Sequence, residues 1–314
     1  MKEESLVHVS PTPLDLLKAI PEEELWLQSQ QSPGTRLGYR SDVLQFMGFL
    51  QIRTTKELRL VDRGAVIAWK RQLEIAGTKP ATVRRKLAAL SSLFSHLVHH
   101  HILPLNPCRE IRRPRINRRT GATPAFSPAQ AAAILDAPDP TTLQGLRDRA
   151  ILSVGFQAGP RRASIVRLRV RDFREDAGFD TLVFQCKGGH EHRVALHPKT
   201  SQRIRNYFVA SRHGEDLDGP LFRPVRSRPD LPSRRALRGQ EIARILKHYA
   251  RLVGVNGRYS AHSMRATFIT VALQNGASLE DVQAAAGHAN PSTTKLYDKR
   301  GYNPDKSAAF FANY

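Results

Sequence analysis

The residues whose side chains are best suited to catalysis lie in one stretch, between Tyr259 and Tyr297. His262 and Arg265 are three residues apart, so on a helix they would share a face. His288 follows a run of small residues, and Tyr297 lies nine positions beyond it. Two histidines, an arginine and a tyrosine at one point would suit phosphoryl transfer with tyrosine as the nucleophile.

Such a reaction needs further groups, and the sequence offers candidates for each. The unperturbed pKa of tyrosine is about 10, so His262 or His288 would have to assist as a base. Negative charge on the nonbridging phosphate oxygens is best stabilised by guanidinium groups, here Arg161 and Arg265. Lys187, in a turn between two strand patterns, could protonate the departing sugar oxygen.

The sequence lacks the motifs of nucleotide-binding and metal-dependent enzymes of phosphoryl transfer. Lys199-Thr200 and Lys306-Ser307 are not preceded by the glycine pattern of a phosphate-binding loop. No carboxylate cluster suits two-metal catalysis. His99, His100 and His101 are adjacent, so on a helix they face different ways, and no matching cysteine or carboxylate set is evident. We interpret them as surface residues, and the sequence predicts neither a metal nor a cofactor.

The charge of the chain indicates a polyanionic partner. Its 314 residues include 49 Lys and Arg against 28 Asp and Glu, for a formal net charge of +21. Nucleic acid is the preferred partner. A membrane surface is the alternative, but no basic amphipathic helix dominates and no apolar run is long enough to span a bilayer. The N-terminal stretch lacks a signal-type apolar core, and two cysteines make no disulfide framework, which predicts a cytoplasmic, nucleoid-associated protein.

The length suggests two domains. We expect a polar tail over residues 1–20 and then a helical, DNA-binding domain over 21–107. The sequence predicts one helix that begins at Ser32, a second over residues 65–75, and a third whose start signal lies at residues 78–82. The last of these helices carries a basic face, which is either solvated or in contact with DNA; the total charge favours contact. Its candidate residues are Arg84, Arg85 and Lys86.

A basic linker over residues 108–124 should separate this unit from a second domain, 125–314. We expect Arg112, Arg113, Arg118 and Arg119 of the linker to contact phosphates. A nuclear localisation signal is a weaker interpretation of the same arginine run. Ser127-Pro128 is a helix start, and strands are expected at 182–186 and 194–196. A short tail helix should open at Pro304. The fold predicted is mainly α with a small β-sheet.

Four of these motifs, in order and spacing, resemble those of the tyrosine recombinases, also called phage integrases, and most closely the bacterial Xer-type and transposon-borne branch. The family's boxes correspond here to Gly159-Pro160-Arg161, Lys187-Gly188, His262-Ser263-Met264-Arg265, and Gly287-His288 with Tyr297. The resemblance covers nearly the whole chain. It implies a SAM-like core-binding domain followed by a mixed α+β catalytic domain. Pro160 and Ser164 depart from the family pattern, which commonly has an apolar and an acidic residue at these positions.

The resemblance also implies roles for the residues. Tyr297 would be the nucleophile that forms a 3′-phosphotyrosine, and Arg161 and Arg265 would bind the scissile phosphate. His262 would act in proton transfer, Lys187 as the general acid, and His288 as a hydrogen-bonding group on the phosphate. The family works as a homo-tetramer on two DNA sites, in some cases with a partner recombinase, and exchanges strands through a Holliday junction. By sequence alone the tail could pack on its own domain, and the resemblance favours docking into a neighbouring subunit.

Two alternatives remain at this point. One is a non-catalytic DNA-binding accessory protein with the same fold, against which the complete set of six residues argues. The other is a type IB topoisomerase or hairpin resolvase that uses the same chemistry, and the compact length disfavours it. Trapping a covalent DNA adduct would separate the first, and detecting strand exchange would separate the second.

Overall fold

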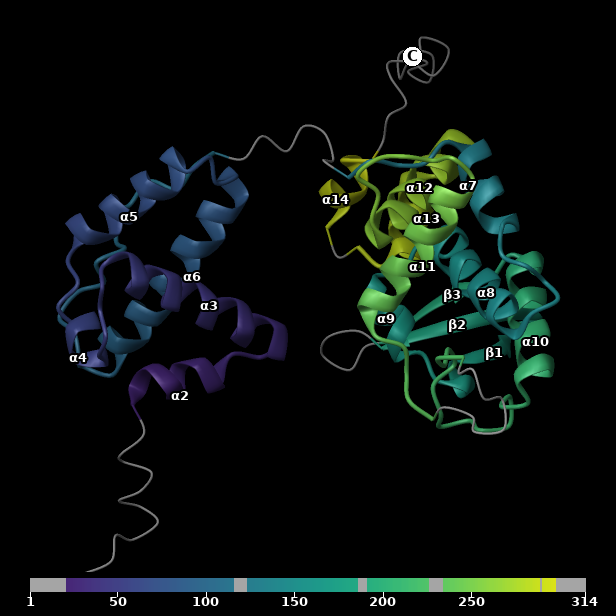
Figure 1. The fold of residues 1–314 in the computed structure, drawn as a ribbon, viewed down its shortest axis with the longest axis horizontal. Coiled ribbons are helices and arrows are strands. Elements are labelled where there is room, and N and C mark those ends of the chain that lie inside the picture. The colour runs from purple at the N-terminus through teal and green to yellow at the C-terminus, as the bar shows by residue number, and fades with distance from the viewer. Residues whose placement is uncertain (1–20, 116–122, 186–190, 226–233, 289, 298–314) are drawn as a thin grey trace, which may run out of the picture. The chain divides into compact units, whose positions relative to one another are not determined.

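The computed structural model describes residues 21–115, 123–185, 191–225, 234–288 and 290–297. The chain divides into two compact units, residues 1–117 and 118–314, so the division falls inside the predicted linker (Figure 1). The predicted tail helix after Pro304 lies outside the described residues.

The N-terminal unit is helical. Its described helices are α2 (Glu22–Ser29), α3 (Pro33–Phe49), α4 (Thr55–Leu58), α5 (Arg63–Ile75) and α6 (Pro80–His99). The predictions for α3, α5 and α6 are confirmed: Ser32 caps α3 by accepting a hydrogen bond from the backbone N–H of Thr35, and Pro80 begins α6. Helices α2 and α4 were not predicted.

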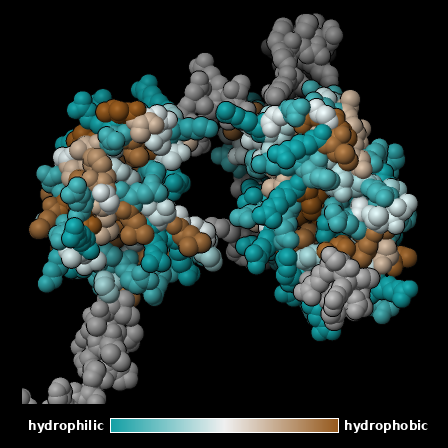
Figure 2. All heavy atoms as spheres, in the orientation of Figure 1, coloured by the Kyte–Doolittle hydropathy of each residue, from teal (hydrophilic) through white to brown (hydrophobic). Residues whose placement is uncertain are grey.

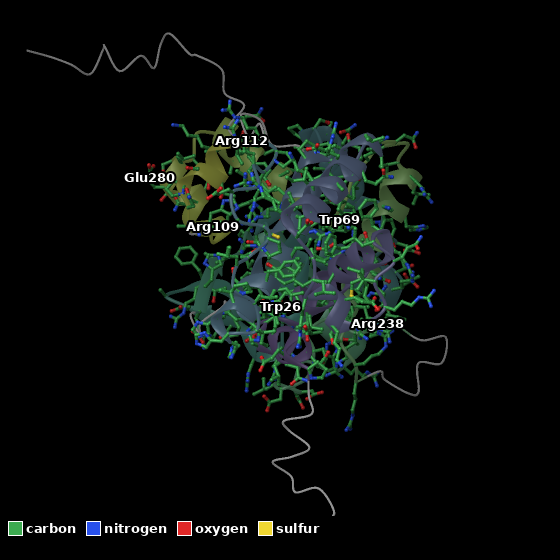
Figure 3. The ribbon with its side chains drawn as sticks, turned by 90° about the vertical axis from the view of Figure 1, so that its left-hand side faces the viewer. Trp26, Trp69, Arg109, Arg112, Arg238 and Glu280 are labelled. Carbon is green, nitrogen blue, oxygen red and sulfur yellow. The ribbon has the colours of Figure 1, made fainter. Side chains whose placement is uncertain are left out.

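The core of this unit forms around α6, whose buried leucines and Phe94 face α2, α3 and α5. Phe46 of α3 packs edge-on against Trp69 of α5, and Trp26 of α2 stacks on Tyr39. Figure 3 shows both tryptophans among the side chains of the unit, and each is almost fully buried. Two large aromatic anchors therefore fix α2 and α5 to α3.

The C-terminal unit is mixed. Its described elements are α7 (Pro128–Asp136), α8 (Leu143–Gln157), α9 (Arg162–Arg167), η1 (Val170–Asp172), β1 (Phe173–Asp176), β2 (Phe179–Gln185), β3 (Glu191–Ala195), α10 (Pro198–Ser211), α11 (Gly239–Leu252), α12 (Ala261–Gln274), α13 (Leu279–Ala286) and α14 (Pro291–Lys295). The strands form an antiparallel sheet in the order β1-β2-β3. The predicted β2 and β3 are confirmed, and β1 was missed.

Two apolar clusters organise this unit. The larger one joins α8, the sheet and α11, and includes Ile151, Leu182 and Leu246. The smaller one lies between α12 and α13 and includes Ile269 and Val282. Figure 1 shows α7, α12, α13 and α14 at one end of the unit and the sheet with α10 at the other. Helix α12 contacts both α8 and α13, so its side chains lie where the two clusters meet.

Hydrophilic side chains cover most of the visible surface of each unit (Figure 2). Among the described residues, the helices are too short or too polar for any of them to cross a membrane.

Candidate active site

Helix α12 positions the two residues that the sequence analysis placed on one helix face. Ser260 caps the helix by accepting a hydrogen bond from the backbone N–H of His262, and its own N–H donates to the Ser263 hydroxyl. Arg265, one turn along, is only 1% exposed. Its Nη1 donates to the carbonyl of Gly159 over 2.6 Å. Its Nε and Nη2 are buried and have no hydrogen-bond partner among the described residues.

Gly159 brings Arg161 close to this buried guanidinium. The glycine has φ +58°, and a Cβ there would lie 2.5 Å from the Phe268 ring of α12. A larger residue would therefore be strained and would clash at the point where the chain leaves α8. Arg161 follows as the N-cap of α9 and is exposed.

The charges of the two arginines repel each other, and Nε and Nη2 of Arg265 have no acidic partner among the described residues. Burial, together with repulsion from Arg161, lowers the pKa of Arg265 to about 10, although Tyr297 acts in the opposite direction. Arg265 therefore remains charged at neutral pH. Two guanidinium groups, one with two unused donors, make a site that an anion such as a phosphate would complete.

Tyr297 lies against the same helix. Pro291 opens α14, which ends at Lys295, and Tyr297 sits in the turn after it. Its carbonyl accepts a hydrogen bond from the Thr270 hydroxyl over 3.3 Å, and its ring belongs to the smaller apolar cluster. Its hydroxyl lies 3.1 Å from Nε2 of His262. The structure thus places the predicted nucleophile in contact with a predicted base.

His288 faces the ring of Tyr297 with an interplanar angle of 13°. Gly287, at φ +61°, ends α13 in the left-handed conformation and turns the chain so that His288 enters the site. Nδ1 of His288 lies 2.8 Å from the Thr294 hydroxyl, which fixes the ring. Burial and the charges of Arg265 and Arg161 lower the pKa of His288 to about 4, so the ring is neutral at neutral pH.

Lys187 lies outside the described residues, but the strands on either side of it are described. His192 of β3 connects this hairpin to the site: its Nε2 lies 3.0 Å from the carbonyl of Ala285 in α13. The same ring would lie 3.2 Å from a Cβ placed on Gly287. No spacing in the sequence indicates that His192 reaches α13.

A pH dependence follows from His262. Partial burial, with the charges of Arg265 and Arg161, lowers the pKa of His262 below its ordinary 6.5. A base must be unprotonated, so cleavage should be lost only as pH falls through this lowered pKa. We expect kcat/KM for covalent adduct formation to be flat near neutrality and to fall with a midpoint below 6.5. His262→Gln should be slower and should lack this inflection; a wild-type midpoint above 6.5, or the same inflection in the variant, would contradict the assignment.

The residues predicted to bind DNA differ in their surroundings. Arg84 is exposed, and Arg85 is half exposed and ion-paired with Asp42. Lys86 is buried, and its ammonium contacts Asp42 and Gln45 inside the domain. In the linker Arg112 and Arg113 are exposed, with Arg112 labelled in Figure 3; Arg118 and Arg119 lie outside the described residues.

The sequence analysis missed a basic surface on α11. Arg244, Lys247, His248 and Arg251 are all exposed on this helix, while Ile242, Leu246 and Tyr249 are buried. The signal was present, because residues spaced by three, four and seven positions lie on one helix face. Part of the positive charge of the C-terminal unit therefore lies on one exposed face of α11.

Comparison with known proteins gives consistent matches. The phage integrase family pattern matches residues 125–303, and the pattern described as "Phage integrase, N-terminal SAM-like domain" matches residues 22–101. A tyrosine recombinase XerC of Pelobacter propionicus is 31% identical over 286 residues, covering 90% of each chain. A tyrosine recombinase XerD of Pseudomonas putida is 31% identical over 285 residues, covering 88% of this chain and 89% of its own.

Two solved structures share the fold. The XerH site-specific recombinase bound to its difH substrate aligns with a TM-score of 0.67 at 17% identity, over 90% of this chain and 84% of that one. A lambda integrase tetramer bound to a Holliday junction aligns with a TM-score of 0.66 at 14% identity, over 91% of this chain and 78% of that one.

Proposed function

The chain belongs to the phage integrase family and is a site-specific tyrosine recombinase, and we propose that Tyr297 attacks a DNA phosphodiester to form a 3′-phosphotyrosine. One observation carries this assignment: the Tyr297 hydroxyl contacts His262 beside a buried arginine whose Nε and Nη2 have no described partner. A phosphate bound to Arg161 and Arg265 would supply the missing acceptors.

The proposed reaction uses each residue once. His262 accepts the Tyr297 proton as the tyrosine oxygen attacks phosphorus. Arg161 and Arg265 stabilise the charge on the nonbridging oxygens, and neutral His288 adds a hydrogen bond. The bond to the 5′ sugar oxygen breaks, and Lys187 protonates that oxygen to leave a 5′-hydroxyl. Attack by a 5′-hydroxyl of another strand reverses these steps and joins DNA without ATP.

The role of Lys187 can be separated from simple phosphate binding. Lys187→Ala should cleave an ordinary phosphodiester about 10²–10⁴-fold more slowly, the range for a lost general acid. It should recover most of that loss on a 5′-bridging phosphorothiolate, because a thiolate leaves without a proton. Single-turnover adduct formation on the two substrates measures the difference, and equal losses on both would refute the role.

DNA binding is proposed to use Arg84, Arg85, the linker arginines and the basic face of α11. Lys86 is left out, since its ammonium is engaged within the N-terminal unit. Affinity should fall steeply with salt, by about 0.9 log unit per phosphate contact per log unit of salt. Replacing Arg112, Arg113, Arg118 and Arg119 with alanine should flatten that slope in a filter-binding or anisotropy titration. An unchanged slope would mean that the linker does not touch DNA.

We also propose that the chain acts as a tetramer on two DNA sites, in the nucleoid, and forms a Holliday junction. The lambda integrase structure named above is such an assembly, and its fold matches this chain over most of its length. In this proposal the segment after Tyr297 docks into a neighbouring protomer. Deleting Ser307 to Tyr314 should then preserve binding to one site and abolish the two-site complex.

The experiment that tests the proposed function uses a nicked DNA substrate. When the nick lies a few nucleotides 3′ of the scissile phosphate in the same strand, cleavage releases the short fragment between them. Its 5′-hydroxyl diffuses away with it, and the covalent protein–DNA adduct accumulates. Sequencing the DNA from adducts captured on the protein would give the cleavage position, and peptide mass spectrometry would identify the tyrosine. A specific target with phosphate on Tyr297 is expected; failure to form any adduct on DNA that the protein binds specifically would overturn the proposal.

A further inference from the structure

A cluster of metal-ligating side chains lies in the N-terminal unit, whereas the residues assigned to catalysis belong to the C-terminal unit. The ligand atoms of Glu22, His96 and His100 all lie within 4.8 Å of one another. We propose that these three side chains bind a divalent transition-metal ion, with Zn²⁺ as the first candidate, and that the ion ties α2 to the end of α6.

The two histidines come from one helix turn. His96 is in the last turn of α6, and His100 is its C-cap residue four positions later. Residues at this spacing share a helix face, and the two rings lie 4.3 Å apart between centroids. Nε2 of His96 also lies 2.9 Å from a carboxylate oxygen of Glu22. Two imidazoles and a carboxylate thus converge from two helices.

Helix α2 holds Glu22 in place through a second contact one turn away. Trp26, four residues after Glu22, donates its indole N–H to the hydroxyl of Ser92, four residues before His96. The pairs Glu22–His96 and Trp26–Ser92 show that α2 and α6 lie antiparallel along this contact. Trp26 is only 3% exposed. Glu22 is therefore delivered by a packed helix and not by a loose surface chain.

The first turn of α2 is also fixed from another side. Glu23 accepts two hydrogen bonds from the Arg59 guanidinium, at 2.9 and 3.1 Å. A bidentate pair of this kind restricts orientation as well as distance. The backbone that carries Glu22 is thus held by α4 and α6 together, which reduces the ordering required when a metal binds.

The donor set suits a transition metal. Zn²⁺ takes imidazole nitrogen at about 2.0–2.1 Å and carboxylate oxygen at about 2.0–2.2 Å, which places tetrahedral ligand atoms about 3.4 Å apart. The ligand atoms of the three side chains, which lie within 4.8 Å of one another, would need to approach only slightly to reach this separation. The His100 side chain is exposed and can rotate to do so. Mg²⁺, which prefers an all-oxygen octahedron, should bind poorly. Three protein ligands leave one position for water.

The local charge also favours a cation, although the whole chain carries +21. Glu22, Glu23 and Glu24 occupy the first turn of α2. The C-terminal end of α6, with its partly unsatisfied carbonyls, carries the negative end of the helix dipole. A dication placed between these two elements would be attracted by both.

The test uses the full chain, freed of metal with EDTA and then titrated with Zn²⁺ or Mg²⁺ by calorimetry. One Zn²⁺ should bind per chain and raise Tm, and Mg²⁺ should do neither. Glu22→Gln and His100→Ala should each weaken Zn²⁺ binding by about tenfold or more, because each removes one of three ligands. His99→Ala and Glu24→Gln are matched controls, since both alter neighbouring exposed residues outside the cluster, and they should bind as the wild type does.

A cysteine site is the competing explanation for any Zn²⁺ that binds. Burial raises the pKa of the Cys108 thiol to about 12, which disfavours a thiolate ligand there. Cys186 lies outside the described residues, so Cys186→Ser is included. Binding lost in Cys186→Ser, or a thiolate-to-cobalt absorption band with Co²⁺, would overturn the proposal. Wild-type affinity in both Glu22→Gln and His100→Ala would overturn it equally.

Discussion

Replacing Tyr297 with phenylalanine should abolish the covalent DNA adduct while leaving DNA binding unchanged. The substitution removes only the hydroxyl that contacts His262. The ring would keep its place in the small apolar cluster and its stacking on His288, so neither the fold nor the phosphate site should change. Loss of a covalent nucleophile costs about 10⁴-fold or more in rate, which is beyond detection in a single-turnover assay.

Tyr302→Phe is the matched control, because this is the next tyrosine along the chain. It should form adduct at the wild-type rate. Both variants should give the same affinity for the target DNA in an anisotropy titration. Adduct formation by the Tyr297 variant that disappears only when Tyr302 is also replaced would move the nucleophile to Tyr302.

Much of this site could be predicted from the sequence because the chemistry fixes residue types and their separations. Helix periodicity placed His262 and Arg265 on one turn, and a capping serine marked where α12 begins. The boxes that carry Arg161 and His288 were recognisable because glycine or proline directly precedes each residue, and Tyr297 follows His288 at a fixed spacing of nine positions. Signals of this kind can be read from the sequence because each depends on residues only a few positions apart.

What the sequence did not show depends on contacts between distant segments. Lys86 looks like part of a basic face, yet its ammonium is buried by Asp42, which lies 44 positions earlier. His192 reaches the carbonyl of Ala285 across 93 positions. Glu22 meets His96 across 74 positions, so the sequence around His99, His100 and His101 showed no matching carboxylate. Short elements such as β1 and α4 have too few residues for a periodic pattern.

Replacing Arg265 with methionine should abolish cleavage without lowering the stability of the free protein. The guanidinium is buried with two nitrogens that have no described partner, so in the absence of DNA it carries a desolvation penalty that is only partly repaid by the Gly159 carbonyl. Methionine fills a similar volume without a charge. We therefore expect the Tm of the free variant to equal or exceed that of the wild type, and adduct formation to fall by at least about 10²–10³-fold, the loss seen for a single preorganised donor.

Arg147→Met provides the matched contrast. Arg147 is also buried, at 7% exposed, but it pairs with Asp148, which is itself buried. Removing its charge leaves that buried carboxylate with the Tyr249 hydroxyl but without its cation, which should cost about 3–5 kcal/mol and lower Tm clearly. The two substitutions remove the same group from similarly buried positions and differ in what the group is paired with. A stability loss in Arg265→Met as large as in Arg147→Met would mean that Arg265 is satisfied within the folded protein. Arg265 would then be a structural residue, and its two unused donors would no longer identify a phosphate site.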